Sequence, residues 1–152
     1  MPDFKFRLEP LLKLRDARRG QRRLALAEAI QAEAMLNQQA DQLTQQLDEM
    51  SKRARVQAAP GKVNVDQLLS VHRYRLQLES QARILQQQET QLAGEVERRR
   101  QALVEADREV HVLEKLKARQ RQEHRIVQQR QEAKELDEFA AQRWSRKQDA
   151  EK

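Results

Sequence analysis

The second half of the chain carries apolar side chains at alternating steps of four and three residues. Starting from Val71, ten of the first thirteen positions in this rhythm are apolar, whereas the next four include only one apolar residue. Such a repeat is typical of a helix that packs along a coiled-coil seam, so it predicts a seam that ends near residue 113. The thirteen positions are Val71, Arg75, Leu78, Ala82, Leu85, Glu89, Leu92, Val96, Arg99, Leu103, Ala106, Val110 and Leu113, followed by Lys117, Gln120, His124 and Val127.

A shorter repeat of the same kind lies upstream, between residues 36 and 54. Before residue 36 the apolar stripe consists mainly of small side chains and is slightly shifted in phase. Such a shift is typical of a stutter in the heptad repeat, and small side chains let two helices approach closely. The regular positions are Leu36, Ala40, Leu43, Leu47, Met50 and Ala54, and the shifted ones are Ala25, Leu26, Ala29, Ile30 and Ala32.

The two repeats are separated by the sequence Ala58-Ala59-Pro60-Gly61. A Pro-Gly pair ends a helix and forms a turn. Asn64 is a suitable N-cap for the helix that follows, with Gln67 at the position of a capping-box partner. The chain is therefore expected to have two long helices joined by a loop at 58–63.

The start of the first helix is indicated by Pro10, which is tolerated only near the first turn. Before it, Phe4, Phe6 and Leu8 alternate with charged residues, as in a short extended segment with one apolar side. The sequence thus predicts an all-α, single coiled-coil domain over residues 1–152. It contains an arm at 2–8 and helices at about 9–57 and 64–148.

If the chain folds back at residues 60–61, residue i lies opposite residue 121 − i. Leu8 is then opposite residue 113, where the apolar repeat of the second helix stops. We therefore expect an antiparallel hairpin within one chain rather than a parallel homodimer. The second helix is longer, and its polar stretch from 117 to 135 would be unpaired.

Apolar spacing returns near the end of the second helix, at Leu136, Phe139, Ala140 and Trp144. These residues share one face of a helix. The stripe could cover the Phe4/Phe6 arm, or it could bind another protein as a helix in a groove. The hairpin places the arm and the stripe far apart along the helix, which favours the binding of a partner.

The composition excludes several classes of function. Of the residues, 36% are charged, three are Gly and none is Cys, with a net charge of +6. No apolar run approaches the roughly 20 residues of a membrane span, and the first residues lack the apolar core of a secretory signal. His72, His111 and His124 have no helical ligand spacing, and three glycines cannot form a phosphate loop. We therefore expect no enzymatic activity, no metal and no cofactor.

Two basic clusters lie at residues 13–23 and at Arg98-Arg99-Arg100. Concentrated positive charge can attract an acidic partner or bind phosphates without sequence specificity. The same residues could also be a solvated coiled-coil flank. Sequence-specific nucleic-acid binding is not expected, because the block at 13–23 is separated from the strongest heptads by the Pro-Gly break.

Both ends of the chain resemble the flagellar FliJ family of type III export proteins. The N-terminal motif is Phe4-Lys5-Phe6-Arg7-Leu8-Glu9-Pro10-Leu11-Leu12-Lys13-Leu14-Arg15, and the C-terminal motif is Glu135-Leu136-Asp137-Glu138-Phe139-Ala140. The Ala-rich start of the first helix, the Pro-Gly break and the stretch from Asp66 to Leu78 also match. The likeness extends over almost the whole chain.

This resemblance implies a cytoplasmic, non-enzymatic stalk protein, peripheral at the cytoplasmic face of the inner membrane. Its implied partners are the hexameric flagellar export ATPase, a membrane export gate protein and export chaperones. For the ATPase, the resemblance implies contacts from Phe4, Phe6 and the stripe residues Leu136, Phe139 and Trp144. For the export gate, it implies contacts from Tyr74 and Leu78.

One family feature is missing. The part of the first helix that faces the gate is often aromatic, whereas here it is a run rich in glutamine: Gln38, Gln39, Gln42, Gln45 and Gln46. Two alternatives remain open at this point. The chain could be the related stalk protein of a virulence type III system, although the Phe-x-Phe arm favours the flagellar version. It could also be a coiled-coil scaffold with no ATPase partner.

Overall fold

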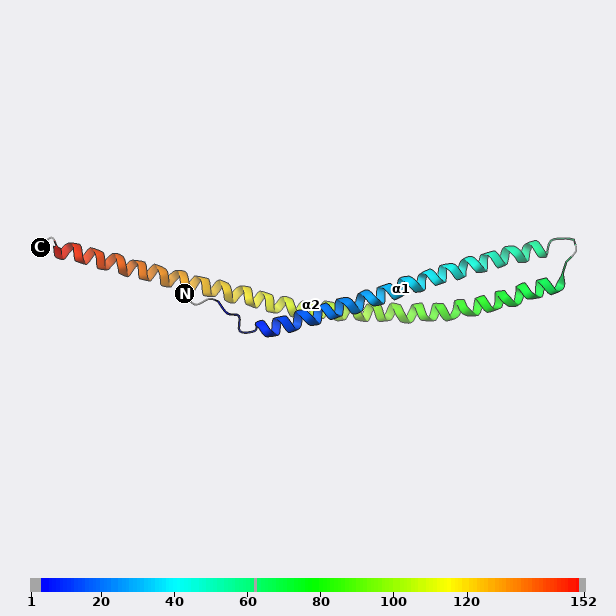
Figure 1. Cartoon of the computed structure of the whole chain (residues 1–152), viewed down its shortest axis with the longest axis horizontal. Coiled ribbons are helices and arrows are strands. Elements are labelled where there is room, and N and C mark those ends of the chain that lie inside the picture. The colour runs from blue at the N-terminus through cyan, green and yellow to red at the C-terminus, as the bar shows by residue number, and fades with distance from the viewer. Residues whose placement is uncertain (1–3, 62, 151–152) are drawn as a thin grey trace. The chain divides into compact units, whose positions relative to one another are not determined.

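The computed structural model describes residues 4–61 and 63–150, with side chains up to Arg146. All regular structure in these ranges is helical, in two elements: α1 (Glu9–Gln57) and α2 (Val65–Ala150) (Figure 1). Their ends lie within two residues of the predicted ones. The all-α prediction, with a longer second helix, is confirmed. Contacts divide the chain into two compact units, which we call the hairpin unit (Gly20–Glu105) and the terminal unit (described residues 4–19 and 106–150).

In the hairpin unit the chain reverses between α1 and α2, so that the two helices lie antiparallel (Figure 1). Gly61 has a φ of 157°, a value that side chains with a Cβ rarely adopt. Asn64 caps α2 as predicted, because its Oδ1 accepts hydrogen bonds from the backbone N–H groups of Asp66 (3.1 Å) and Gln67 (3.4 Å). Lys62, part of the predicted loop, lies outside the described residues.

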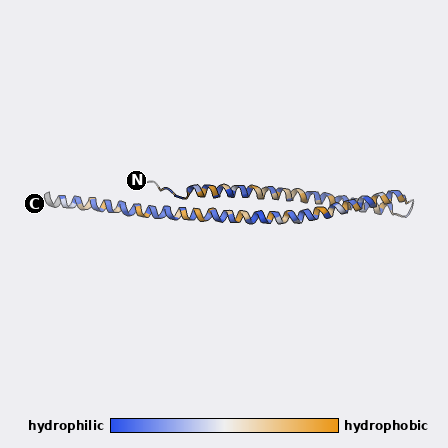
Figure 2. Ribbon diagram, turned by 90° about the horizontal axis from the view of Figure 1, so that it is seen from below, coloured by the Kyte–Doolittle hydropathy of each residue, from blue (hydrophilic) through white to orange (hydrophobic). Residues whose placement is uncertain are grey.

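The core of the hairpin unit is a narrow aliphatic seam rather than a broad interior. Leu43, Met50 and Leu78 are buried together, with half-buried Leu47, Ala82 and Leu85 packed against them. In Figure 2 hydrophobic residues accordingly recur at intervals along both helices, between hydrophilic turns. Of the thirteen predicted seam positions in α2, all except Arg75 are buried or half-buried.

The predicted stutter in α1 is wrong. Burial continues in unbroken steps of three and four, and the seam position upstream of Leu36 is the half-buried Glu33 rather than Ala32, which is exposed. The apolar residues seemed out of phase only because a charged residue occupies the seam. The positions in these steps are 26, 29, 33, 36, 40, 43, 47, 50, 54 and 57, and residues 25 and 51 beside them are also half-buried.

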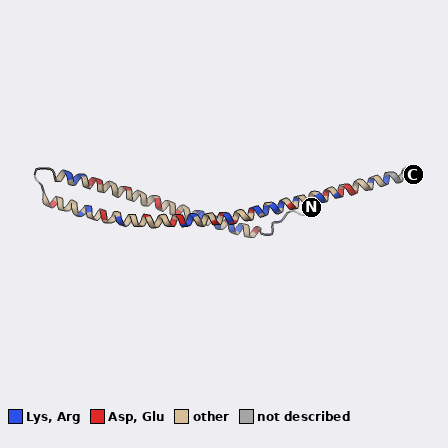
Figure 3. Ribbon diagram, turned by 180° about the vertical axis from the view of Figure 1, so that it is seen from behind, with Lys and Arg blue, Asp and Glu red and all other residues tan. Residues whose placement is uncertain are grey.

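The terminal unit pairs the start of α1 with the second half of α2 through a small apolar core and several ion pairs. Val110 is fully buried and Ala106 is nearly so. Around them Arg15 binds Glu109 at 2.7 Å and Arg19 binds Asp107 at 3.1 Å, in both cases between helices. Figure 3 shows charged residues of both signs along the two helices. This part is therefore held by charge as well as by apolar burial.

Pairing extends further along α2 than the apolar repeat predicted. Glu9 should face residue 112 (121 − 9), but it forms a 2.7 Å salt bridge with Lys117, and the ring of Phe4 lies 5.7 Å from that of His124. Lys117 and His124 occupy seam positions, where long or amphipathic side chains can bury their apolar part. The end predicted near residue 113 is thus wrong, because polar residues continue the seam.

The extended part of the N-terminal arm ends before residue 8. The described part, Phe4 to Phe6, has no regular structure, and the chain then turns at Arg7-Leu8. The backbone N–H of Glu9 donates to the carbonyl of Phe6 at 3.1 Å, which starts α1 directly after the turn. The predicted residues 2 and 3 of the arm lie outside the described residues.

Candidate partner-binding surfaces

The end of α2 offers the largest side chains left uncovered by the described chain. Every side chain from Gln129 to Arg146 is exposed; we call this stretch the free segment. Within it, Leu136, Phe139 and Trp144 are 69%, 67% and 69% exposed. They share one helix face with Ala140, as the sequence predicted. Large apolar side chains grouped on an uncovered face are typical of a surface that binds another protein.

The aromatic residues of the arm lie elsewhere on α2. Phe6 is buried, and the ammonium group of Lys117 lies 6.0 Å from its ring centroid. Phe4 contacts His124, and Leu136 follows twelve residues later, about 18 Å along the helix. The described residues of the arm therefore do not reach the stripe and do not cover it. Phe6 serves as an anchor of the arm on α2.

Tyr74 and Leu78, the two residues expected to face the export gate, have different environments in the hairpin unit. Tyr74 is 44% exposed, whereas Leu78 is only 2% exposed, in the core with Leu43 and Met50. Leu78 therefore packs between the helices and does not offer its side chain to another protein. The exposed Tyr74 lines an open groove of about 510 Å³ together with Gln46, Glu49, Met50, Arg53, Ser70 and Val71.

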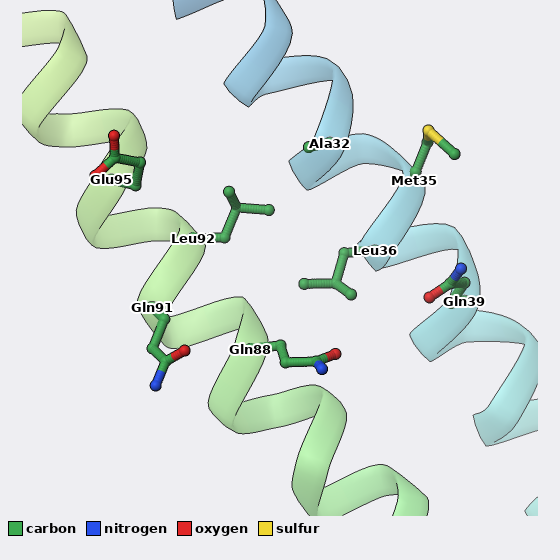
Figure 4. A pocket seen from close by; sticks show the side chains of 8 residues that line it. All are labelled: Ala32, Met35, Leu36, Gln39, Gln88, Gln91, Leu92 and Glu95. Atoms are coloured by element: carbon green, nitrogen blue, oxygen red, sulfur yellow. The ribbon is translucent and has the colours of Figure 1, made fainter.

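A second groove of the hairpin unit was not predicted from the sequence. It encloses about 500 Å³, and Figure 4 shows Leu36 and Leu92 pointing toward one another across it. Met35 lies at its edge and is exposed, on the outer side of α1. Ala32, which lines this groove next to the seam, has a small side chain that leaves room for it. This alanine is the only feature of the sequence that indicated a groove here. The lining residues are Ala32, Met35, Leu36, Gln39, Gln88, Gln91, Leu92 and Glu95.

The glutamine run of α1 also borders the seam. Gln39, Gln42 and Gln46 line a further groove of about 290 Å³, together with Leu43, Gln81, Ile84 and Leu85. Neutral amides can donate and accept hydrogen bonds, but they provide less apolar contact than the aromatic residues expected from the family. Tyr74 of α2 lines a groove together with Gln46 of this run.

Many arginines of the two basic clusters are used within the chain. In the first cluster, Arg19 binds both Asp16 (2.6 Å) and Asp107 (3.1 Å). The hydrogen bonds that Arg19 donates to these two carboxylates raise the pKa of its guanidinium group, and the bond to Asp107 contributes most. Arg15 binds Glu109. These contacts favour a structural role for this cluster over a free binding site for anions.

The second cluster is organised by Glu95. This carboxylate accepts a 2.8 Å hydrogen bond from Arg99 and forms a 2.6 Å ion pair with Arg98. Both lower its pKa, with the hydrogen bond from Arg99 contributing most. Arg99 also donates to the carbonyl of Ala25 on α1 at 2.5 Å. Arg99 therefore connects the two helices from a seam position.

The described residues contain no group of three or more His, Asp or Glu side chains that could hold a metal ion. In the same part of the chain, neither helix has a stretch that is long and apolar enough to cross a membrane. The exposed features of the described residues include the stripe, Tyr74 and the grooves along the hairpin unit. These surfaces suit contacts with other proteins.

Comparison with known proteins agrees with this description. The family model described as flagellar FliJ protein matches residues 4–149, nearly the whole chain. No curated protein and no solved structure gives a significant match. The matched region includes the described part of the arm, α1, nearly all of α2 and the stripe of the free segment. The chain therefore belongs to the FliJ family, whose members are non-enzymatic components of the flagellar export apparatus.

Proposed function

We propose that this protein is a stalk that binds the hexameric flagellar export ATPase through the free segment. The observation that carries the proposal is the exposure of Leu136, Phe139 and Trp144 on a stretch of α2 that nothing else in the described chain covers. A single helix with one apolar face can enter a groove or the opening of a ring, where it buries that face.

In this proposal the protein acts mechanically. Ring subunits contact the stripe in turn, and each contact stabilises the assembled and active ring because it buries aromatic surface. Phe4 contributes at the edge of the contact, since it is half-buried against α2, and Phe6 holds the arm in place. No residue of this chain takes part in the chemistry of ATP hydrolysis.

The stalk would also couple the ATPase to the membrane export gate. The exposed side chain of Tyr74 is the proposed gate contact, and the buried Leu78 keeps that part of α2 in place against α1. Escort of export chaperones belongs to the same proposal, as does a location at the cytoplasmic face of the inner membrane. The protein would be held there by the export apparatus rather than by lipid.

The ATPase contact can be tested with the double variant Phe139→Ala plus Trp144→Ala. We expect it to lose stimulation of the purified ATPase while its circular dichroism spectrum is unchanged, because both side chains are exposed. Leu24→Ala is a matched control, since Leu24 is 67% exposed, like Phe139, but lies in the hairpin unit. Full stimulation by the double variant would contradict the proposal.

The gate contact can be tested with Tyr74→Ala in a pull-down with the cytoplasmic part of the gate protein. We expect weaker binding with normal thermal stability, and partial recovery in Tyr74→Phe, which keeps the ring. Unchanged binding by Tyr74→Ala would remove this residue from the interface. A pull-down that recovers neither the ATPase nor the gate protein would support a coiled-coil scaffold instead.

A further inference from the structure

We infer that the free segment also pairs with the free segment of a second copy of this chain, in antiparallel orientation. This inference goes beyond the proposed function and does not depend on it. It rests on the distribution of charge along the segment, on the apolar stripe and on the position of Ala140.

The charge of the free segment changes sign along its length. Residues 129–138 contain four acidic and two basic side chains, whereas residues 139–146 contain two arginines and no acidic residue. Figure 3 shows acidic residues followed by basic ones toward the end of α2. All these side chains are exposed. The acidic residues are Glu132, Glu135, Asp137 and Glu138, and the arginines of the second part are Arg143 and Arg146.

This distribution favours one orientation of a pair. Two parallel copies would place acidic residues beside acidic ones and arginines beside arginines, which is unfavourable. Two antiparallel copies centred on Ala140 place Arg143 of each segment opposite Asp137 of the other. The stretch opposite residues 139–146 is then 134–141, which contains three acidic residues and one basic residue, Lys134. Opposite charges on both sides of a seam are what sets orientation in coiled coils.

The apolar residues fit the same arrangement. With Ala140 opposite Ala140 of the second copy, Leu136 lies opposite Trp144, because both pairs sum to 280. The small alanines let the helices approach at the centre, and the large side chains on either side fill the space between them. Self-pairing would cover the surface proposed to bind the ATPase, so the two interactions would exclude each other.

The first test uses the single tryptophan of the chain, Trp144. In the full-length protein, we expect sedimentation to show a dimer that forms with increasing concentration, together with a blue shift of tryptophan emission. A chain that remains monomeric up to about 1 mM would overturn the inference.

The second test exchanges charges. Arg143→Glu plus Arg146→Glu, and separately Glu135→Lys plus Asp137→Lys plus Glu138→Lys, should each weaken self-association by about tenfold or more. An equimolar mixture of the two variants should restore association, because one segment then carries six acidic and two basic side chains, whereas the other carries one acidic and seven basic side chains. Association that is unaffected by either variant, or not restored in the mixture, would overturn pairing through this segment.

The third test determines orientation by disulfide formation, which the absence of native cysteine allows. In an antiparallel pair, Ala140→Cys should cross-link to itself, whereas two copies of Leu136→Cys would be separated by eight residues, about 12 Å along the axis. A disulfide requires Cα atoms within about 7 Å. Efficient cross-linking of Leu136→Cys would instead indicate a parallel pair and refute the inferred orientation. Loss of dimerisation with normal ATPase stimulation would leave the proposed function intact.

Discussion

Replacement of Leu78 by alanine tests whether this residue stabilises the hairpin unit by packing in its core. Leu78 is 2% exposed and lies in the core with Leu43 and Met50. Truncation of a buried leucine costs about 2–5 kcal/mol of unfolding free energy, depending on how well the site collapses. The flanking side chains of Leu47, Ala82 and Leu85 are only half-buried and can relax into the gap. We therefore expect a loss near the lower end, about 2–3 kcal/mol.

The measurement is urea unfolding followed by circular dichroism at a helical wavelength, which gives the free energy by linear extrapolation. Leu76→Ala is a matched control, because Leu76 lies on the same helix and is 52% exposed. The two variants share the change in helix propensity, so their difference reports burial. If Leu78→Ala and Leu76→Ala lose the same amount, Leu78 is not a core residue and the described seam is incorrect.

Three further changes test local features. Gly20→Ala should stabilise α1 by about 1 kcal/mol, since an added Cβ meets no atom within 4 Å; a lower melting temperature would contradict this. Asn64→Ala should cost about 1 kcal/mol by removing the N-cap of α2, while Asn64→Asp should not. Because the pKa of Glu95 is lowered, its contribution to stability is present above the usual pKa of glutamate and is lost as the pH falls through the lowered value. Melting temperatures of wild type and Glu95→Gln should therefore converge in acid, and a constant difference would argue against this ion pair.

The apolar pattern predicted both helices because their seam is mostly aliphatic. A period of three and four residues is imposed by helical geometry, so positions such as Val96 and Val110 could be assigned to the seam directly. The turn was equally accessible, because Pro60, Gly61 and Asn64 each have a conformational preference that does not depend on distant residues. These local signals also placed the helix ends within two residues of the observed ones.

The pattern could not predict where polar residues continue the seam. Three charged residues are half-buried at seam positions: Arg19, Glu33 and Lys117. A search for apolar residues alone treats these positions as breaks in the seam. Long charged side chains bury their hydrocarbon part and keep the charged group near water or near an opposite charge. Whether they do so depends on the residues of the facing helix, so the sequence of one helix alone does not reveal it.

For the candidate sites too, the sequence predicted some features and not others. The side chains of the stripe are exposed, as expected for apolar spacing that returns after a long polar stretch without a partner helix. Tyr74 and Leu78 were treated alike because the family resemblance assigned both of them to the export gate. Only Leu78 is at a seam position of the 4-3 repeat, and it is accordingly buried, whereas Tyr74 lies on the flank of the seam. The 4-3 repeat of the sequence therefore already distinguished the buried Leu78 from the exposed Tyr74.

Stability and register in this protein depend on different residues. Burial of aliphatic side chains along the seam stabilises the pairing of the helices, but a regular apolar seam tolerates sliding by a heptad. The ion pairs of Glu9 with Lys117 and of Arg15 with Glu109 lie near the surface and contribute little individually. They nevertheless fix the alignment. Sliding by seven residues would place Glu9 opposite the buried Val110 in one direction, and Arg15 opposite Leu116 in the other. The charged part of the seam thereby determines where pairing ends, and hence how much of α2 is left uncovered for a partner.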